Sequence, residues 1–146
     1  MRPQRPSLNE KTAAIAWARA FNTHDLSLLA PLVDDRLCVS DQLRWNQMLG
    51  GRHYLTMLGD YFECVPLEPT SNWMEIATLP DAPMAPTPPR PCVVEYRHGK
   101  PTYTILFRVH AGKILHIERR LLPPPTACRL SGIYPGLDTG PSEEVN

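Results

Sequence analysis

The chain has 146 residues, enough for one domain with a single buried core and too few for two. Apolar residues make up 42% of the sequence and charged residues 21%, which is typical of a folded globular protein and argues against general disorder. Lys+Arg and Asp+Glu both count 15, so the basic excess that nucleic-acid-binding proteins usually carry is absent.

No membrane-spanning or export segment is predicted near the N-terminus. The first apolar stretch, residues 13–21, is short, follows Glu10 and Lys11, and contains Arg19. We therefore expect a cytoplasmic protein with no membrane partner and no nucleic-acid partner.

The cysteines and histidines are too scattered to predict a metal site. No C-x-x-C, H-x-x-x-H or H-E-x-x-H spacing occurs, so we expect no metal and no cofactor. Without an export signal, reduced buried thiols are favoured over disulfides at the four cysteines, Cys38, Cys64, Cys92 and Cys128.

The first third of the chain predicts helices. The segment Ser7–Glu10 has the pattern of a capping box, in which Ser7 caps the first helix. Apolar side chains at helical spacing follow, at Ala14, Trp17, Ala18 and Phe21. Asp25 can cap a second helix, which Pro31 should keep short or kinked.

A strand and a third helix are predicted next. Residues 37–41 form a short strand candidate, followed by a turn that contains Trp45. Gly50-Gly51 marks a helix start, and Pro66 ends the helix predicted over 52–65. Its apolar side chains repeat at helical intervals, at Tyr54, Leu58, Tyr61, Phe62 and Val65.

The second half predicts strands. A strand over 72–79 precedes a proline-rich loop, Pro80–Pro91, and a three-stranded meander follows over 92–97, 102–109 and 113–121. Pro123-Pro124-Pro125 should end the regular structure. We expect one domain over residues 1–125 and a Gly/Pro-rich C-terminal tail over 126–146.

Helices followed by mainly antiparallel strands predict an α+β fold. Helices with one apolar stripe would pack on the concave face of a curved sheet. The space between the first helix and the inner face of the sheet would then form a cavity suited to a small apolar ligand.

Three segments resemble the nuclear transport factor 2-like superfamily, which includes SnoaL-like polyketide cyclases and ketosteroid isomerases. They are Trp17–Leu26 with Leu32–Asp35, Gly51–Phe62, and Leu106–Glu118 with the two arginines that follow. The resemblance implies a cone-shaped, cystatin-like fold, with a curved antiparallel sheet packed against three N-terminal helices. It also implies a homodimer that forms through the outer face of the sheet.

The resemblance further suggests a catalytic set. Asp41 occupies the place of the general-base aspartate in ketosteroid isomerases. Trp17 and Thr104 fall where those enzymes carry oxyanion-stabilising donors, although neither is the phenol or the carboxylic acid found there. The alternatives are that Asp41 caps the turn before Trp45 and that Trp17 only packs in the core.

Strand alternation predicts that Arg119 points inward with Leu115, Ile117 and Leu121, while Ile114, His116, Glu118 and Arg120 share the outer face. A buried guanidinium needs an anion, and Asp41, Glu95 or an acidic ligand could supply it. In that case Arg119 would orient a substrate or hold Asp41 ionised. Alternatively, Arg119 extends to water at the strand end.

We expect a binding protein for a small apolar molecule, including an isomerase or cyclase that acts on a carbonyl compound with Asp41, Arg119 and Thr104 as catalytic residues. A non-catalytic dimerisation or ligand-sensing module is the alternative, and the proline-rich loop or the tail could recruit a protein partner. Large apolar side chains are the candidate cavity walls, unless they are ordinary core: Trp17, Phe21, Trp45, Tyr54, Leu58, Phe62, Trp73, Tyr96 and Ile117.

Overall fold

The structure, a computed structural model, describes residues 8–42, 46–65, 72–80, 89–121 and 124–137. Two α-helices, three short 3-10 turns and seven strands follow one another along these residues. In chain order they are α1 (Glu10–Thr23), η1 (Leu26–Leu28), η2 (Ala30–Leu32), β1 (Val33–Asp41), β2 (Asn46–Leu49), α2 (Gly51–Cys64), β3 (Trp73–Leu79), β4 (Arg90–Arg97), β5 (Lys100–His110), β6 (Lys113–Arg120), η3 (Pro125–Ala127) and β7 (Arg129–Ile133).

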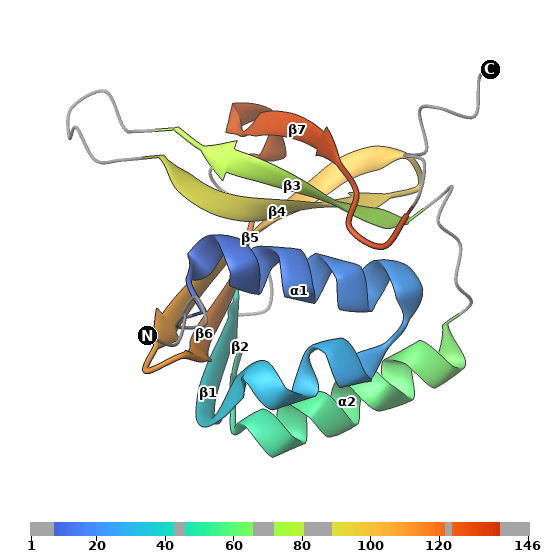
Figure 1. Ribbon diagram of the computed structural model, residues 1–146. Helices are drawn as coiled ribbons and strands as arrows, with labels where there is room; N and C mark the ends of the chain where they lie inside the picture. The colour runs from blue at the N-terminus through green and yellow to red at the C-terminus, as the bar shows by residue number, and fades with distance from the viewer. Residues whose placement is uncertain (1–7, 43–45, 66–71, 81–88, 122–123, 138–146) are drawn as a thin grey trace, which may run out of the picture.

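The strands form one sheet in the order β2-β1-β6-β5-β4-β3-β7, with the two helices on one side of it (Figure 1). The α+β architecture predicted from the sequence is confirmed. The sheet is mixed, however, because β1 and β6 pair in parallel while every other neighbouring pair is antiparallel. The strand β2 was not predicted, and it pairs with β1.

The helical layer differs from the prediction at two points. The side chain that caps α1 is Asn9, whose Oδ1 accepts a hydrogen bond from the backbone N–H of Thr12 at 2.9 Å. Ser7, the predicted cap, lies outside the described residues. The second predicted helix is a pair of 3-10 turns, η1 and η2. Asp25 caps the first, and Pro31 lies at the start of the second, where its missing N–H is tolerated.

The main core lies between the helices and the concave face of the sheet. The helix α1 packs on β3, β4 and β5, and α2 packs on β1. Ala13, Ala14 and Ala18 allow α1 to approach closely, and the larger Trp17 meets Phe107 of β5 edge to face at 5.7 Å. Small residues alternating with one large aromatic therefore bring α1 near the sheet.

An irregularity in β6 changes which side chains point inward. Arg108 pairs with His116 and the next residue, Val109, pairs with Ile114, so Leu115 is an extra residue in β6. Ile114 is consequently buried in the core, although simple alternation had predicted it on the outer face. Beyond the bulge, Ile117 and Arg119 face inward as predicted.

Regular structure does not end at the three prolines. The strand β7 pairs antiparallel with β3, so the predicted tail contributes an edge strand on the far side of the sheet (Figure 1). A buried carboxylate supports this pairing: Glu75 of β3 accepts the backbone N–H of Gly132 at 2.8 Å and the hydroxyl of Tyr96 at 2.7 Å. The domain end predicted at residue 125 would therefore separate β7 from the sheet to which it belongs.

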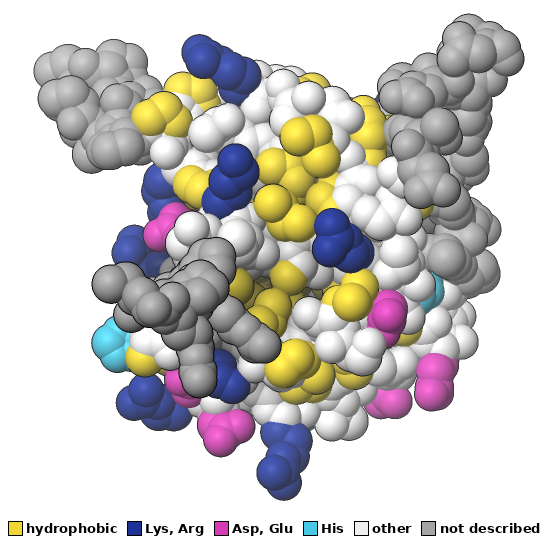
Figure 2. Space-filling view, in the orientation of Figure 1, with side chains coloured by type: hydrophobic (Ala, Val, Ile, Leu, Met, Phe, Trp, Pro, Cys, Tyr) yellow, Lys and Arg dark blue, Asp and Glu magenta, His cyan; other side chains and the backbone are white. Residues whose placement is uncertain are grey.

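The described helices are both short, and neither combines the length and apolar character that crossing a membrane requires. Figure 2 shows hydrophobic side chains gathered around a hollow in the face that carries the helices, with charged side chains mostly around it. The apolar hollow therefore lies on the helix-covered, concave side of the sheet.

Candidate functional site

Strand register assembles a polar cluster across four neighbouring strands. Asp41 in β1 is paired directly with Arg119 in β6. Arg119 is paired with Ile105 in β5, and Tyr103, two residues earlier on the same strand, is paired with Glu95 in β4. Because positions two apart on a strand share a face, all five side chains project to the concave side.

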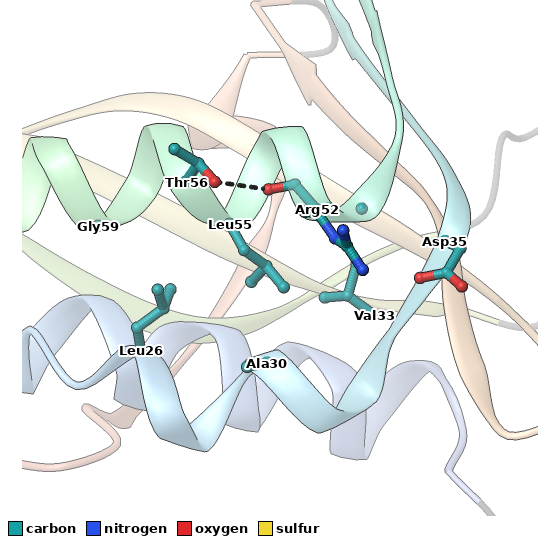
Figure 3. Close-up of a pocket in the computed structure, with 9 residues that line it drawn as sticks. Leu26, Ala30, Val33, Asp35, Arg52, Leu55, Thr56 and Gly59 are labelled. Carbon is teal, nitrogen blue, oxygen red and sulfur yellow. Dashed lines mark hydrogen bonds between the residues drawn. The ribbon is translucent and has the colours of Figure 1, made fainter.

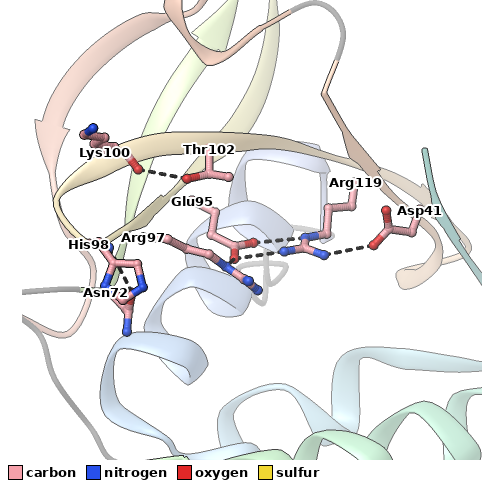
Figure 4. Close-up of polar contacts among 8 residues, drawn as sticks. All are labelled: Asp41, Asn72, Glu95, Arg97, His98, Lys100, Thr102 and Arg119. Carbon is pink, nitrogen blue, oxygen red and sulfur yellow. Dashed lines mark hydrogen bonds and ion pairs between the residues drawn. The ribbon is translucent and has the colours of Figure 1, made fainter. Parts of the chain in front are cut away.

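Arg119 is the centre of this cluster (Figure 4). Its Nε and Nη2 donate to the two carboxylate oxygens of Glu95, each at 3.1 Å, and its Nη1 donates to Oδ2 of Asp41 at 2.9 Å. The guanidinium also lies over the ring of Tyr103, with Cζ 3.5 Å from the ring centroid. One arginine is thus held by two acids and an aromatic face, which fixes its position.

The surroundings of Arg119 favour its charge. Burial by itself would lower the pKa of Arg119, but the carboxylates of Glu95 and Asp41 outweigh it and raise the pKa above its usual value. Glu95 receives a further hydrogen bond from Nε of Arg97 at 2.7 Å. Two acids and two arginines therefore balance one another at this place.

A cavity of about 320 Å³ opens beside the cluster, between α1, α2 and the sheet. Asp41, Glu95, Arg97 and Arg119 form its polar end. The rest of the wall is mainly apolar and aromatic: Trp17, Phe21, Val39, Tyr54, Met57, Leu58, Tyr61, Met74, Ile105 and Ile117. An apolar cavity with a few convergent polar groups is the usual form of a small-molecule site.

A buried hydrogen bond joins the two helices at the cavity wall. Nε1 of Trp17 donates to the hydroxyl oxygen of Tyr54 at 3.0 Å. This bond uses an acceptor site of the hydroxyl, so Tyr54 keeps its own proton for donation. Burial raises the pKa of Tyr54 well above its usual value, although the bond from Trp17 opposes the shift. Tyr54 is therefore a neutral hydrogen-bond donor.

Most of the predicted site residues meet here. The residues of the prediction that line the cavity are Asp41, Arg119, Trp17, Phe21, Tyr54, Leu58 and Ile117. Asp41 and Glu95 together provide the anion that Arg119 was predicted to need, so the alternative of an arginine directed to water does not hold. The predicted use of the Trp17 N–H toward a ligand is corrected, because Tyr54 occupies that donor.

Thr104 is on the wrong face for the role predicted for it. It is fully buried, but it pairs with Val94 and Arg120 on the outer side of the sheet. Its Oγ1 lies 3.5 Å from Sγ of Cys128. Strand alternation places its neighbours Tyr103 and Ile105 inward and Thr104 outward, so it cannot donate into the cavity.

Three other predicted wall residues lie elsewhere, and a fourth is outside the described residues. Trp73 and Tyr96 stack on each other at 4.7 Å on the outer face. Phe62 lies against His24, with ring centroids 4.7 Å apart, and does not line the cavity. Trp45 is the residue that the structure does not describe.

Several residues of the site were not predicted from the sequence, among them Tyr103, Met57, Tyr61 and Met74. Met57 and Tyr61 follow Tyr54 at helical intervals on α2, which was a usable signal. Tyr103 carried a weaker signal, since it shares a strand face with Ile105. Its contact with Arg119 depends on how β5 and β6 align, which no local pattern shows.

A second depression, of about 390 Å³, lies between α2 and the two 3-10 turns (Figure 3). Leu26, Val33 and Leu55 form its apolar floor, and Asp35 and Arg52 supply charge at one end. It has no counterpart of the Arg119 cluster. Over the whole described part of the chain, no three His, Cys, Asp or Glu side chains are placed to hold a metal ion.

The architecture agrees with that of several solved proteins. A nuclear transport factor 2-like protein of unknown function from Cytophaga hutchinsonii has a TM-score of 0.52 at 11% identity, over 86% of this chain and 98% of its own. A cystatin-fold protein from Novosphingobium aromaticivorans has a TM-score of 0.52 at 18% identity, over 77% and 98% of the two chains. The chain has the nuclear transport factor 2-like fold.

The nuclear transport factor 2-like fold predicted from three sequence segments is thereby confirmed. A candidate ketosteroid isomerase from Kribbella flavida also shares it, with a TM-score of 0.52 at 14% identity over 79% of this chain and 82% of its own. By sequence alone, the chain matches no family profile and no curated protein. Because this fold carries unrelated activities, the site itself must support any proposal about function.

Proposed function

We propose that the protein binds a small, largely apolar, uncharged molecule in the cavity and moves a proton on it through Asp41. The observation that carries the proposal is the 2.9 Å contact between Asp41 and Arg119 at the polar end of an otherwise apolar wall. A carboxylate in such a place can remove a proton from a carbon next to a carbonyl group. The reaction class is that of an isomerase or a cyclase.

Charge at the site supports a neutral ligand. Arg119 makes three hydrogen bonds to carboxylate oxygens, and Arg97 makes a further one to Glu95. A carboxylate or phosphate ligand would have to compete with these protein acids and would meet their repulsion. A ketone, which offers only a neutral acceptor, avoids this cost.

Tyr54 is the group best suited to bind the carbonyl oxygen. Its hydroxyl is fixed by Trp17 and remains protonated because burial raises its pKa. A neutral phenol that donates to a developing enolate oxygen stabilises the transition state more than the ground state. In this scheme Asp41 accepts the proton from carbon, Tyr54 stabilises the oxygen, and Arg119 positions Asp41.

Deuterium exchange tests the proposal directly. A panel of steroid ketones, polyketide-like phenols and apolar acids is screened by thermal shift, and each ketone that raises Tm is then incubated with enzyme in deuterated water. We expect incorporation of deuterium next to the carbonyl by the wild-type chain, and loss of most of that rate in Asp41→Asn with binding retained. The matched control is Glu118→Gln, because Glu118 is a carboxylate that pairs with Arg120 on the other face of the sheet.

Two outcomes would contradict parts of the proposal. Failure of every compound to shift Tm would overturn binding in this cavity. Binding without exchange by the wild-type chain would instead support the non-catalytic ligand-sensing alternative. Two observations favour that alternative: Thr104 faces away from the cavity, and the Trp17 N–H is already occupied.

The homodimer implied by the family resemblance stays a prediction. Analytical ultracentrifugation at micromolar concentration tests it. A single species with the mass of one chain would contradict a dimer, and a species of twice that mass would support it.

A further inference from the structure

Two cysteines that are 36 positions apart meet on the face of the sheet opposite the cavity. Sγ of Cys92, in β4, lies 3.8 Å from Sγ of Cys128, which joins η3 to β7. Both are free thiols. A disulfide needs about 2 Å between the sulfurs, so the two sulfurs would have to approach each other by roughly another 2 Å to form one.

The pairing of β7 fixes Cys128 in this place. Ala77 of β3 is paired with Cys92 on one side and with Leu130 on the other, and Cys128 is two residues before Leu130. The bond from Gly132 to Glu75 holds the same strand. The two thiols therefore meet through sheet pairing that is independent of the cysteines themselves.

The surroundings make the two sulfurs unequal. Cys92 is fully buried, whereas Cys128 is 9% exposed. The thiol of Cys92 and the hydroxyl of Thr104 are both within hydrogen-bonding distance of Sγ of Cys128. Hydrogen bonding from Cys92, assisted by Thr104 and opposed by burial, lowers the pKa of Cys128, and the same interaction raises the pKa of Cys92.

We propose that Cys92 and Cys128 are a reversible oxidation site, at which a peroxide converts the two thiols into an intrachain disulfide. The Cys128 thiolate attacks one peroxide oxygen and the O–O bond breaks, which leaves a sulfenic acid and releases water after protonation. Cys92 then attacks the sulfenyl sulfur. Its proton leaves with the displaced hydroxide as a second water, so two thiols and one peroxide yield a disulfide and two waters.

The cross-link would fasten the edge strand β7 to an interior strand of the sheet. It would join β4 directly to the segment that carries β7, which among the described strands pairs with the neighbouring β3. Closing a loop of this length restricts the unfolded chain, so Tm should rise by roughly 5–15 °C on oxidation. Because the pair faces away from the cavity, this proposal is independent of the proposed function.

The test uses the full chain, reduced and then treated with a few equivalents of hydrogen peroxide. We expect loss of two of the four thiols, an intact mass lower by two hydrogens, and a non-reduced proteolytic fragment that joins Cys92 to Cys128. A thiol reductant should restore all four thiols. Cys64→Ser, which removes an exposed thiol, should cross-link as the wild type does.

Cys128→Ser should lose no thiol pair and should show no rise in Tm with peroxide. Cys128 is slightly less buried than Cys92, so this variant keeps the test valid even if Cys92→Ala does not fold. Retention of all four thiols in the treated wild type would overturn the proposal. Addition of two or three oxygens to Cys128 without a cross-link would overturn it equally, because the buried thiol would then have failed to reach the sulfenic acid.

Discussion

Nη1 of Arg119 lies 2.9 Å from Oδ2 of Asp41, although 78 positions separate the two residues in the chain. Their contact follows from the one parallel pairing in the sheet, which places them opposite each other at the ends of β1 and β6. Arg119 thereby links Asp41 to Glu95 and closes the polar end of the cavity.

Arg119→Met should lower the free energy of unfolding by about 1–3 kcal/mol, because it leaves the carboxylates of Asp41 and Glu95 close together without their shared cation. Urea denaturation measures the change. Arg120→Met is the matched control, since the adjacent arginine pairs with Glu118 on the other face and should cost under about 1 kcal/mol. Equal losses in the two variants would contradict a special role for Arg119.

Glu75→Gln should weaken the attachment of β7. The amide of glutamine can still accept from Tyr96, but its NH₂ group then faces the N–H of Gly132, so that backbone donor loses its charged acceptor. We expect a loss of about 1–3 kcal/mol. In the same variant, the backbone amide of Gly132 should exchange its hydrogen faster than in the wild type. Unchanged exchange at that amide would show that Glu75 does not hold the strand.

Two glycines of α2 should respond oppositely to alanine. A Cβ at Gly51 would lie 2.3 Å from the backbone oxygen of Asp34, so Gly51→Ala should cost about 1–3 kcal/mol or more. A Cβ at Gly59 would meet Leu26 at 3.6 Å, an ordinary contact, and Gly59→Ala should stabilise the helix by about 0.5–1 kcal/mol. The Tm of each variant, compared with that of the wild type, measures the effect. A Gly51→Ala variant with an unchanged Tm would contradict the close approach of α2 to β1.

His24 should contribute to the pH dependence of stability below neutrality. Partial burial against Phe62 lowers its pKa, while a backbone hydrogen bond at Phe62 opposes this. The unfolded chain therefore takes up the proton first as pH falls through about 6.5. Protonation of His24 therefore favours the unfolded chain. Its contribution to the free energy of unfolding is complete above about pH 6.5 and is lost as the pH falls below that value.

His24→Asn removes this contribution while keeping a residue that tolerates the left-handed backbone at φ 53°. Urea denaturation at pH 5 and pH 7 compares the two chains. The loss of stability on acidification should be smaller in the variant than in the wild type. A larger loss of stability in the variant would mean that the charged form of His24 stabilises the folded chain.

Local sequence patterns predicted the elements whose stability comes from their own apolar faces. The helix over 52–65 and the strands of the meander match α2, β4, β5 and β6 closely, because each buries side chains that repeat with the period of the element. The strand β7 gave no such signal. All five of its residues are exposed, and backbone pairing to β3 together with Glu75 holds it in place.

The sequence by itself determined the two α-helices and the strands β1 and β3 to β6 in their order, the inward face of β6 beyond its bulge, and the need of Arg119 for an anion. The tertiary structure decided that Asp41 and Glu95 supply it together, that Thr104 faces away, and that Cys92 meets Cys128. The reason is physical: periodicity shows which face a side chain takes, whereas strand register and bulges, fixed by packing and hydrogen bonds between distant segments, select its neighbours.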